Sequence, residues 1–359
     1  MESIILNEIL YDRQNVDQII NPALPVDSWW NAVGYFLKDW FDDSDFITVH
    51  TSGSTGIPKS IRLSKLSMEN SARMTNQFFQ LTNKSNCLLC LPVSYIAGKM
   101  MIVRAIVSGF QLLAVEPSAN PFINLQDSID FTAITPYQLF HSFETLKAKS
   151  VGKIIVGGGS VTSKLELLSE NIPSELYETY GMTETCSHIA LRRFNGVERS
   201  NCFTILDGVS IRLDERGCLA ICAPHLLKEE IQTNDIVELK SAASFRWLGR
   251  ADSTINSGGI KIHPEQLEKK LEGIIPTGYF ISSIPDEQFE NCVVLVIESQ
   301  KYSFQELKNL EIHLEKVLSK YEIPKHLYFL SSFIYSESNK VLRKPTLEKA
   351  IKQGESHSC

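Results

Sequence analysis

The stretch Thr51–Lys59, which reads TSGSTGIPK, constrains the fold more than any other part of this sequence. It follows the β-branched pattern Phe46–His50, which predicts a strand. Gly53 and Gly56 permit backbone conformations that a Cβ would obstruct, and the exposed N–H groups, hydroxyls and lysine of such a turn suit polyphosphate oxygens. A solvated loop between two strands is the alternative. The Walker spacing is absent, because Pro58 stands five residues after Gly53.

The composition is that of an ordinary globular chain. Its 359 residues can form one large domain or two, and a formal charge of −7 argues against a nucleic-acid surface. The longest apolar stretch, Leu88–Val115, is interrupted by Lys99 and Arg104, so we expect no membrane insertion. The beginning MESIILNEILYDRQ lacks the basic start and the cleavage site of a signal peptide. We therefore expect a cytoplasmic protein.

Strand and helix patterns alternate along the chain. The strand pattern Gln111–Val115 precedes a strand-then-helix unit near Pro136, and the strand pattern Lys153–Val156 runs into three glycines. This alternation predicts an α/β sheet, and the last hundred residues predict a smaller α+β unit. Cys87 and Cys90 lie in an apolar strand pattern without a second C-x-x-C, which indicates buried thiols rather than a zinc site.

TSGSTGIPK resembles the phosphate loop of the adenylate-forming superfamily, which comprises acyl-CoA synthetases, peptide-synthetase adenylation domains and luciferases. Later motifs of this superfamily are matched in order by YGMTE at 180–184, TND at 233–235, GRAD at 249–252, SGGIKIHPEQLE at 257–268 and NKVLR at 339–343. The resemblance implies a large N-terminal domain over residues 1–251, shortened ahead of the phosphate loop. It also implies a small mobile C-terminal lid over residues 252–359, with the hinge at Asp252.

The resemblance implies roles for single residues. Lys340 is expected to stabilise charge on the α-phosphate, Thr183 to donate to a phosphate oxygen, and Glu184 to hold Mg²⁺. From composition alone, Lys340 beside Arg343 would belong to a solvated basic tail. The residues expected to bind ATP or AMP are Thr51, Ser52, Gly53, Ser54, Thr55, Gly56, Lys59, Gly158, Gly159, Ser160, Tyr180, Gly181, Asp235 and Arg250.

The string GMTETCSHIAL resembles the o-succinylbenzoate–CoA ligases of menaquinone biosynthesis, whose substrate carries two carboxylates. The expected pocket residues are Tyr95, Arg104, Ser187 and His188, with Tyr95 at a position where the superfamily often has histidine. Arg104 stands in the middle of the apolar helix pattern Lys99–Ser108. It would either reach solvent, pair with an acidic side chain, or anchor the spare carboxylate of the substrate.

The resemblance therefore implies an ATP-dependent acid–CoA ligase that forms an acyl-adenylate and then a thioester. Its expected cofactor and cosubstrates are Mg²⁺, ATP and coenzyme A, and its partner is a small aromatic carboxylic acid. Two alternatives share the motifs: an enzyme that loads an aryl acid onto a carrier protein, and a non-catalytic adenylate-binding protein. A homo-oligomer is compatible with the sequence.

Overall fold

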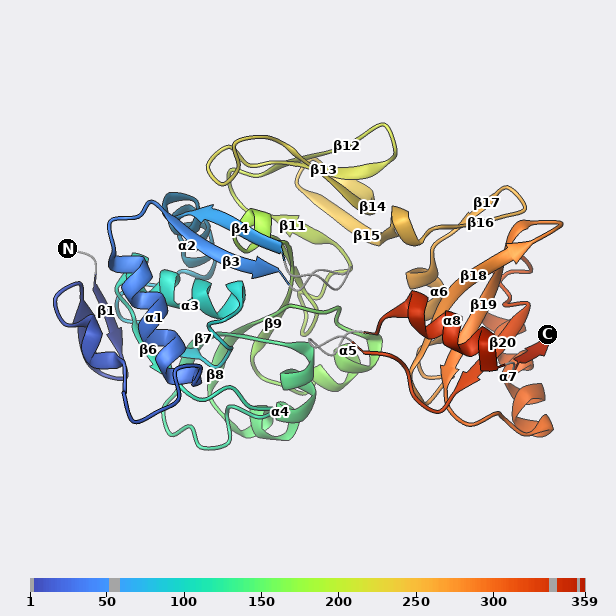
Figure 1. Ribbon diagram of the computed structural model, residues 1–359, viewed down its shortest axis with the longest axis horizontal. Coiled ribbons are helices and arrows are strands. Elements are labelled where there is room, and N and C mark those ends of the chain that lie inside the picture. Colours follow the sequence, from blue (N-terminus) through green and yellow to red (C-terminus); the bar gives the residue numbers. More distant parts are fainter. Residues whose placement is uncertain (1–2, 52–58, 336–340, 354–355, 359) are drawn as a thin grey trace.

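The computed structural model describes residues 3–51, 59–335, 341–353 and 356–358, whose strands form three sheets. A thirteen-stranded sheet takes its strands from residues 3–250, and a six-stranded sheet takes its strands from residues 255–358. The hairpin of β3 (Phe46–Thr51) and β4 (Lys59–Ser64) stands apart from both. Figure 1 shows the C-terminal elements, in orange and red, lying to one side of the others. Strands and helices alternate along the chain, as the sequence predicted.

One half of the large sheet is parallel. In spatial order its strands are β1 (Ser3–Leu6), β6 (Gln111–Ala114), β5 (Asn86–Leu89), β7 (Ile129–Ile134), β8 (Val151–Val156) and β9 (Glu175–Gly181). The antiparallel strand β2 (Ile9–Asp12) forms the edge beside β1. In open α/β sheets, ligands bind outside the carboxyl ends of parallel strands, and the glycine turn 157–159 follows β8 at that edge.

The other half of the large sheet is antiparallel. Continuing from β9, its strands are β10 (His188–Arg193), β11 (Phe203–Ile205), β15 (Ser244–Arg250), β14 (Ile231–Ser241), β13 (Cys218–Cys222) and β12 (Ser210–Leu213). Tyr180 and Phe245 pack edge to face at 5.1 Å, although β9 and β15 are not neighbours in the sheet. This half is therefore curled, and its inner aromatic side chains meet.

Helices cover the large sheet and begin at predictable signals. They are α1 (Trp29–Phe41), α2 (Lys65–Phe79), α3 (Ile96–Ser108), α4 (Pro136–Ala148) and α5 (Ser163–Ser169), with the 3₁₀ turns η1 (Val16–Ile19) and η2 (Thr183–Thr185). Thr135 and Gln138 form a capping box around the first turn of α4, with Pro136 at its first position. Helix α3 ends at Gly109, whose φ of +68° few other residues adopt.

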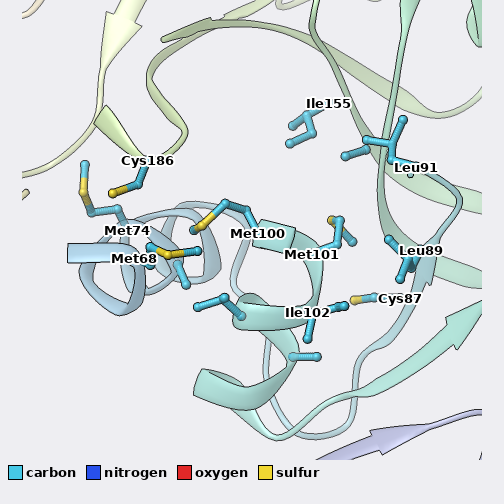
Figure 2. Close-up of a cluster of buried hydrophobic side chains, with 14 of the residues drawn as sticks. Met68, Met74, Cys87, Leu89, Leu91, Met100, Met101, Ile102, Ile155 and Cys186 are labelled. Carbon is cyan, nitrogen blue, oxygen red and sulfur yellow. The ribbon is translucent and has the colours of Figure 1, made fainter. Parts of the chain in front are cut away.

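The core beneath α2 and α3 is rich in sulfur. Figure 2 shows Met68 and Met74 near Cys186, and Met100 and Met101 on the neighbouring helix. Methionine side chains fill irregular gaps between packed elements. Cys87 and Cys90 are buried as predicted, and burial raises the pKa of Cys90 to about 12. Over the described residues, no helix is both long and apolar enough to cross a bilayer.

The C-terminal unit has cores of its own, built from residues 255–350. Its elements are η3 (Ala251–Ser253), β16 (Ile255–Ser257), β17 (Ile260–Ile262), α6 (Pro264–Leu271), β18 (Tyr279–Asp286), β19 (Glu290–Glu298), α7 (Phe304–Val317), β20 (His326–Leu330), α8 (Arg343–Gln353) and β21 (Ser356–Ser358). It touches the large unit where Glu272 accepts a hydrogen bond from the backbone N–H of Ser163 at 2.7 Å.

Candidate active site

Two predicted regions fall outside the described residues. They comprise Ser52, Gly53, Ser54, Thr55 and Gly56 of the phosphate-loop motif, and Lys340 of the C-terminal motif. Thr51 is the last residue of β3 and pairs with Lys59, the first residue of β4, so the motif joins two antiparallel strands. Strand β4 contacts η2, which carries Thr183 and Glu184. The strand that follows the loop motif therefore lies beside the end of the YGMTE motif.

Tyr180 and Asp235 are joined by a hydrogen bond. The phenol of Tyr180 donates to Asp235 Oδ2 at 2.7 Å, and the indole N–H of Trp247 donates to Asp235 Oδ1 at 3.1 Å. Asp235 is 9% exposed, and its backbone N–H donates to Thr233 Oγ1. Burial, followed by the charge of Asp235, raises the pKa of Tyr180. These contacts hold a carboxylate in one orientation while its remaining lone pairs can accept further hydrogen bonds.

Arg250 pairs with Asp252 at the junction of the two units. Arg250 lies opposite Asp235 in the β14–β15 ladder, and its guanidinium donates to both oxygens of Asp252 at 2.9 and 2.8 Å. Hydrogen bonding to Arg250 lowers the pKa of Asp252 below its usual value. The predicted nucleotide residue and the predicted hinge residue are thus partners.

A hydrogen bond to Glu178 holds the end of the glycine turn that follows β8. Gly158 has a φ of +80°, and Gly158, Gly159 and Ser160 are exposed. The next residue, Val161, donates its backbone N–H to Glu178 Oε1 at 2.8 Å. A Cβ on Gly157 would lie 2.4 Å from Thr179 Oγ1, so the turn packs directly against β9.

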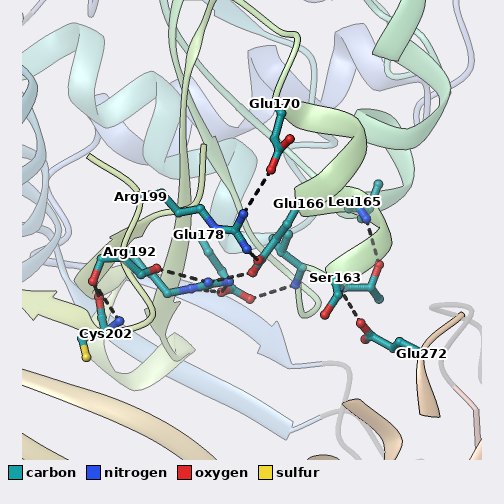
Figure 3. Close-up of polar contacts among 12 residues, drawn as sticks. Ser163, Leu165, Glu166, Glu170, Glu178, Arg192, Arg199, Cys202 and Glu272 are labelled. Atoms are coloured by element: carbon teal, nitrogen blue, oxygen red, sulfur yellow. Dashed lines mark hydrogen bonds and ion pairs between the residues drawn. The ribbon is translucent and has the colours of Figure 1, made fainter. Parts of the chain in front are cut away.

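A buried ion network continues from Glu178, as Figure 3 shows. Arg192, opposite Glu178 in the β9–β10 ladder, donates twice to Glu178 Oε2 at 2.8 and 2.6 Å. It also pairs with Glu166 of α5 at 2.7 Å, and Arg199 pairs with the other oxygen of Glu166 at 2.9 Å. The network ties α5 and the glycine turn to the sheet.

Glu184 suits a magnesium ion shared with a substrate. Its carboxylate is exposed and makes no hydrogen bond or ion pair with the described residues. Mg²⁺ is commonly held by one or two carboxylates together with phosphate oxygens. Over the same residues no group of three or more acidic, histidine or cysteine side chains could hold a metal.

The described residues on either side of 336–340 pair with each other. Tyr335 and Val341 form an isolated antiparallel β-bridge, and the backbone N–H of Leu342 donates to the backbone carbonyl of Ile334 at 2.8 Å. Arg343 makes two hydrogen bonds to the carboxylate of Glu268 on α6, each 2.8 Å long. Glu268 and Arg343 belong to the last two motifs of the sequence, which the fold brings together.

Arg104 lies in a chain of hydrogen bonds with two other predicted pocket residues. Its Nη2 donates to Ser187 Oγ at 2.7 Å, and Ser187 Oγ lies 3.2 Å from His188 Nδ1. His188 Nε2 lies 3.3 Å from Thr75 Oγ1 on α2. Thr75 is a residue that the sequence patterns did not single out.

The charge of Arg104 has no acidic partner among the described residues. The side chain is 1% exposed. Among the described residues its Nε has no hydrogen-bond partner, and its Nη1 has only the sulfur of Met101 at 3.5 Å. Over the part of the chain that the structure describes, Arg104 therefore neither reaches solvent nor forms a salt bridge. Burial lowers the pKa of Arg104 to about 9. A buried cation of this kind favours binding of an anion.

Tyr95 does not join this group. It is the residue before α3 and is 49% exposed, whereas Arg104 lies nine residues later, about 13 Å along the helix. The structure thus brings together Arg104, Ser187 and His188, and places Tyr95 directly before the first turn of α3.

Comparison with known proteins identifies the family. Residues 8–218 match the model of the family described as AMP-binding enzyme. A 2-succinylbenzoate–CoA ligase of Staphylococcus epidermidis is 26% identical over 353 residues, covering 86% of this chain and 70% of that protein. One from Lactococcus lactis is 24% identical, covering 85% and 71%.

Solved structures show the same fold. An acyl-CoA synthetase (AMP-forming)/AMP-acid ligase II-like protein from Dyadobacter fermentans is 34% identical, with a TM-score of 0.62, over 95% of this chain and 99% of that one. O-succinylbenzoate coenzyme A synthetase from Bacillus subtilis, in complex with ATP and magnesium, is 20% identical, with a TM-score of 0.71 over 84% and 69%. The chain therefore belongs to the AMP-binding enzyme family, the adenylate-forming enzymes whose motifs its sequence resembles.

Proposed function

We propose that this chain is an AMP-forming acid–CoA ligase that converts o-succinylbenzoate to o-succinylbenzoyl-CoA for menaquinone biosynthesis. ATP, Mg²⁺ and coenzyme A take part in the reaction. The curated relatives named 2-succinylbenzoate–CoA ligase support this substrate, and so does the enzyme from Bacillus subtilis, which was solved with ATP and magnesium and, separately, with the acyl-adenylate intermediate.

Arg104 is the observation that carries the substrate proposal. Its guanidinium is 1% exposed, and among the described residues its Nε has no hydrogen-bond partner and no acidic side chain pairs with it. Such a buried cation favours binding of an anion. An ordinary monocarboxylic acid would use its only carboxylate at the phosphate. A dicarboxylic acid has a second carboxylate, which fits the planar fork of a guanidinium.

The proposed chemistry proceeds in two steps. A carboxylate oxygen of the acid attacks the α-phosphorus of ATP, and pyrophosphate leaves with the bonding electron pair. The coenzyme A thiolate then attacks the acyl carbonyl, and AMP leaves as the thioester forms. Mg²⁺ would neutralise phosphate charge beside Glu184, and Lys340 would stabilise the charge that develops on the α-phosphate.

The remaining site residues have supporting roles in this proposal. Tyr180 would stack on the base and Asp235 would bind the ribose. The glycine turn 157–159 would face the adenine, and the Thr51–Lys59 motif would hold the leaving pyrophosphate. Residues 252–359 would turn about Asp252 between the two steps, so that Lys340 serves the first step only.

Pyrophosphate release across a panel of acids tests the proposal. The panel contains o-succinylbenzoate, its monoester with the spare carboxylate masked, benzoate and aliphatic acids, each assayed with coenzyme A and with a carrier protein. We expect the highest kcat/KM for o-succinylbenzoate and a coenzyme A thioester by mass spectrometry. Transfer to the carrier protein alone would favour the carrier-loading alternative, and no pyrophosphate release with any acid would favour a non-catalytic protein.

Arg104→Ala tests the carboxylate anchor. We expect KM for o-succinylbenzoate to rise about 10- to 100-fold, because a charged hydrogen bond is worth about 1.5–3 kcal/mol. KM for ATP should stay unchanged. An unaltered KM for the acid would remove Arg104 from the pocket.

A further inference from the structure

We propose that Thr75 and His188 are positioning residues that orient Ser187 and, through it, the guanidinium of Arg104 for the second carboxylate of the substrate. This inference rests on the proposed function, because it assigns the device that sets the selectivity of the same pocket. Thr75 lies on α2, His188 and Ser187 lie at the start of β10, and Arg104 lies on α3.

The direction of the hydrogen bonds follows from the chemistry of the four groups. Thr75 Oγ1 donates to the carbonyl of Ser71 at 3.1 Å, so it can only accept from His188 Nε2. A neutral imidazole that donates through Nε2 accepts through Nδ1, and Ser187 Oγ is its partner there. Arg104 has donors only, so Ser187 accepts from its Nη2.

The environment keeps this order in place. Thr75 is 0% exposed and His188 is 4% exposed, so water does not compete for their hydrogen bonds. Burial and the charge of Arg104 lower the pKa of His188 well below 6.5, which keeps the imidazole neutral. The backbone carbonyl of Arg104 also accepts from the Asn76 side chain at 2.9 Å, so α2 fixes the backbone of this arginine directly and its guanidinium through His188 and Ser187.

The consequence is a guanidinium that is fixed through one N–H of Nη2 and can still offer the other, which is parallel to the N–H of Nε or to one N–H of Nη1. Ser187 holds Nη2, while among the described residues Nε has no hydrogen-bond partner and Nη1 has only the Met101 sulfur. A carboxylate needs two parallel N–H groups in a set plane, and a poorly oriented guanidinium loses that fit. Removing the acceptor at Thr75 releases the imidazole, then the hydroxyl, then the guanidinium.

The test compares selectivity between o-succinylbenzoate and its monoester with the spare carboxylate masked. We expect Thr75→Val to lower the ratio of the two kcat/KM values about fivefold to tenfold through KM for the diacid, while KM for ATP stays unchanged. Thr75→Ser restores the hydroxyl and should restore the ratio. His188→Gln can accept and donate in the same order and should keep most of it, whereas His188→Leu should lose it.

A matched control separates positioning from stability. Thr132 is also 0% exposed and donates to a backbone carbonyl, that of Leu88, so Thr132→Val should lower the melting temperature and leave the ratio alone. If Arg104→Ala lowers the ratio while Thr75→Val and His188→Leu do not, the positioning role is overturned and the substrate proposal stands. If Arg104→Ala leaves the ratio unchanged, Arg104 is not the carboxylate anchor and the positioning role is overturned with it, whereas the substrate proposal is decided by the panel of acids.

Discussion

Tyr180 Oη lies 2.7 Å from Asp235 Oδ2, although β9 and β14 are four places apart in the sheet. Strands about 4.8 Å apart would place them about 19 Å from each other in a flat sheet. The antiparallel half must therefore curl until its inner face closes on itself. The Trp247 indole completes the contact from β15, so three strands set the orientation of one carboxylate.

Asp235→Ala should raise KM for ATP about 10- to 100-fold, because the carboxylate would no longer accept hydrogen bonds from the ribose hydroxyls. Tyr180→Phe keeps the carboxylate and should raise KM for ATP less than tenfold. Direct titration with AMP checks both variants without turnover. Equal AMP affinity in Asp235→Ala and the unmodified chain would argue against a ribose contact.

Lys340→Ala should separate the two half-reactions. Loss of one preorganised charge partner typically costs about 10²–10³ in rate, so adenylate formation should fall by at least that factor. Thioester formation from supplied acyl-adenylate and coenzyme A should be nearly unchanged. Pyrophosphate release measures the first step and the thioester measures the second. A similar loss in both steps would contradict a role confined to the first.

The motifs, the strand–helix alternation and the separate C-terminal unit could be predicted from the sequence, because each depends on neighbouring residues. The partners of charged side chains could not. Arg104 stands out in its apolar helix, yet its acceptor Ser187 lies 83 residues away. Glu178 and Arg192 read as ordinary polar strand positions until the β9–β10 register places them opposite each other. The pairing of β1 with β6 is equally non-local.

His188→Gln should change how stability depends on pH. The folded chain keeps His188 neutral, since burial lowers its pKa well below 6.5, whereas the unfolded chain protonates it near its ordinary pKa. Below about pH 6.5 the unfolded state therefore binds one more proton, and stability falls by about 1.4 kcal/mol per pH unit from this group. Above that pH both states are neutral, so the contribution is constant.

Urea unfolding between about pH 5 and pH 7 measures this difference. The glutamine variant should lose less stability on acidification than the unmodified chain, and the gap should open only below about pH 6.5. Parallel curves would mean that His188 takes up its proton over the same pH range in the folded and the unfolded chain.

Arg192→Met should destabilise the chain by about 3–5 kcal/mol, because it leaves the carboxylate of Glu178 buried without its cation. The side chains of Arg192 and Glu178 are 6% and 10% exposed. Arg193 is the matched control: its partner at 2.6 Å, Glu198, is 73% exposed, so Arg193→Met should cost about 1 kcal/mol or less. Urea unfolding compares the two variants, and equal losses of stability would show that the buried pair contributes no more than the exposed one.

A second variant tests whether the loss of stability in Arg192→Met comes from the unpaired charge of Glu178. Glu178→Gln added to Arg192→Met removes that charge, and the amide oxygen can still accept from the Val161 N–H at the glycine turn. The double variant should therefore be more stable than Arg192→Met alone, a coupling expected of residues in direct contact. If the two losses simply add, the buried pair stabilises the turn through packing, and the charge of Glu178 is already neutralised by other groups.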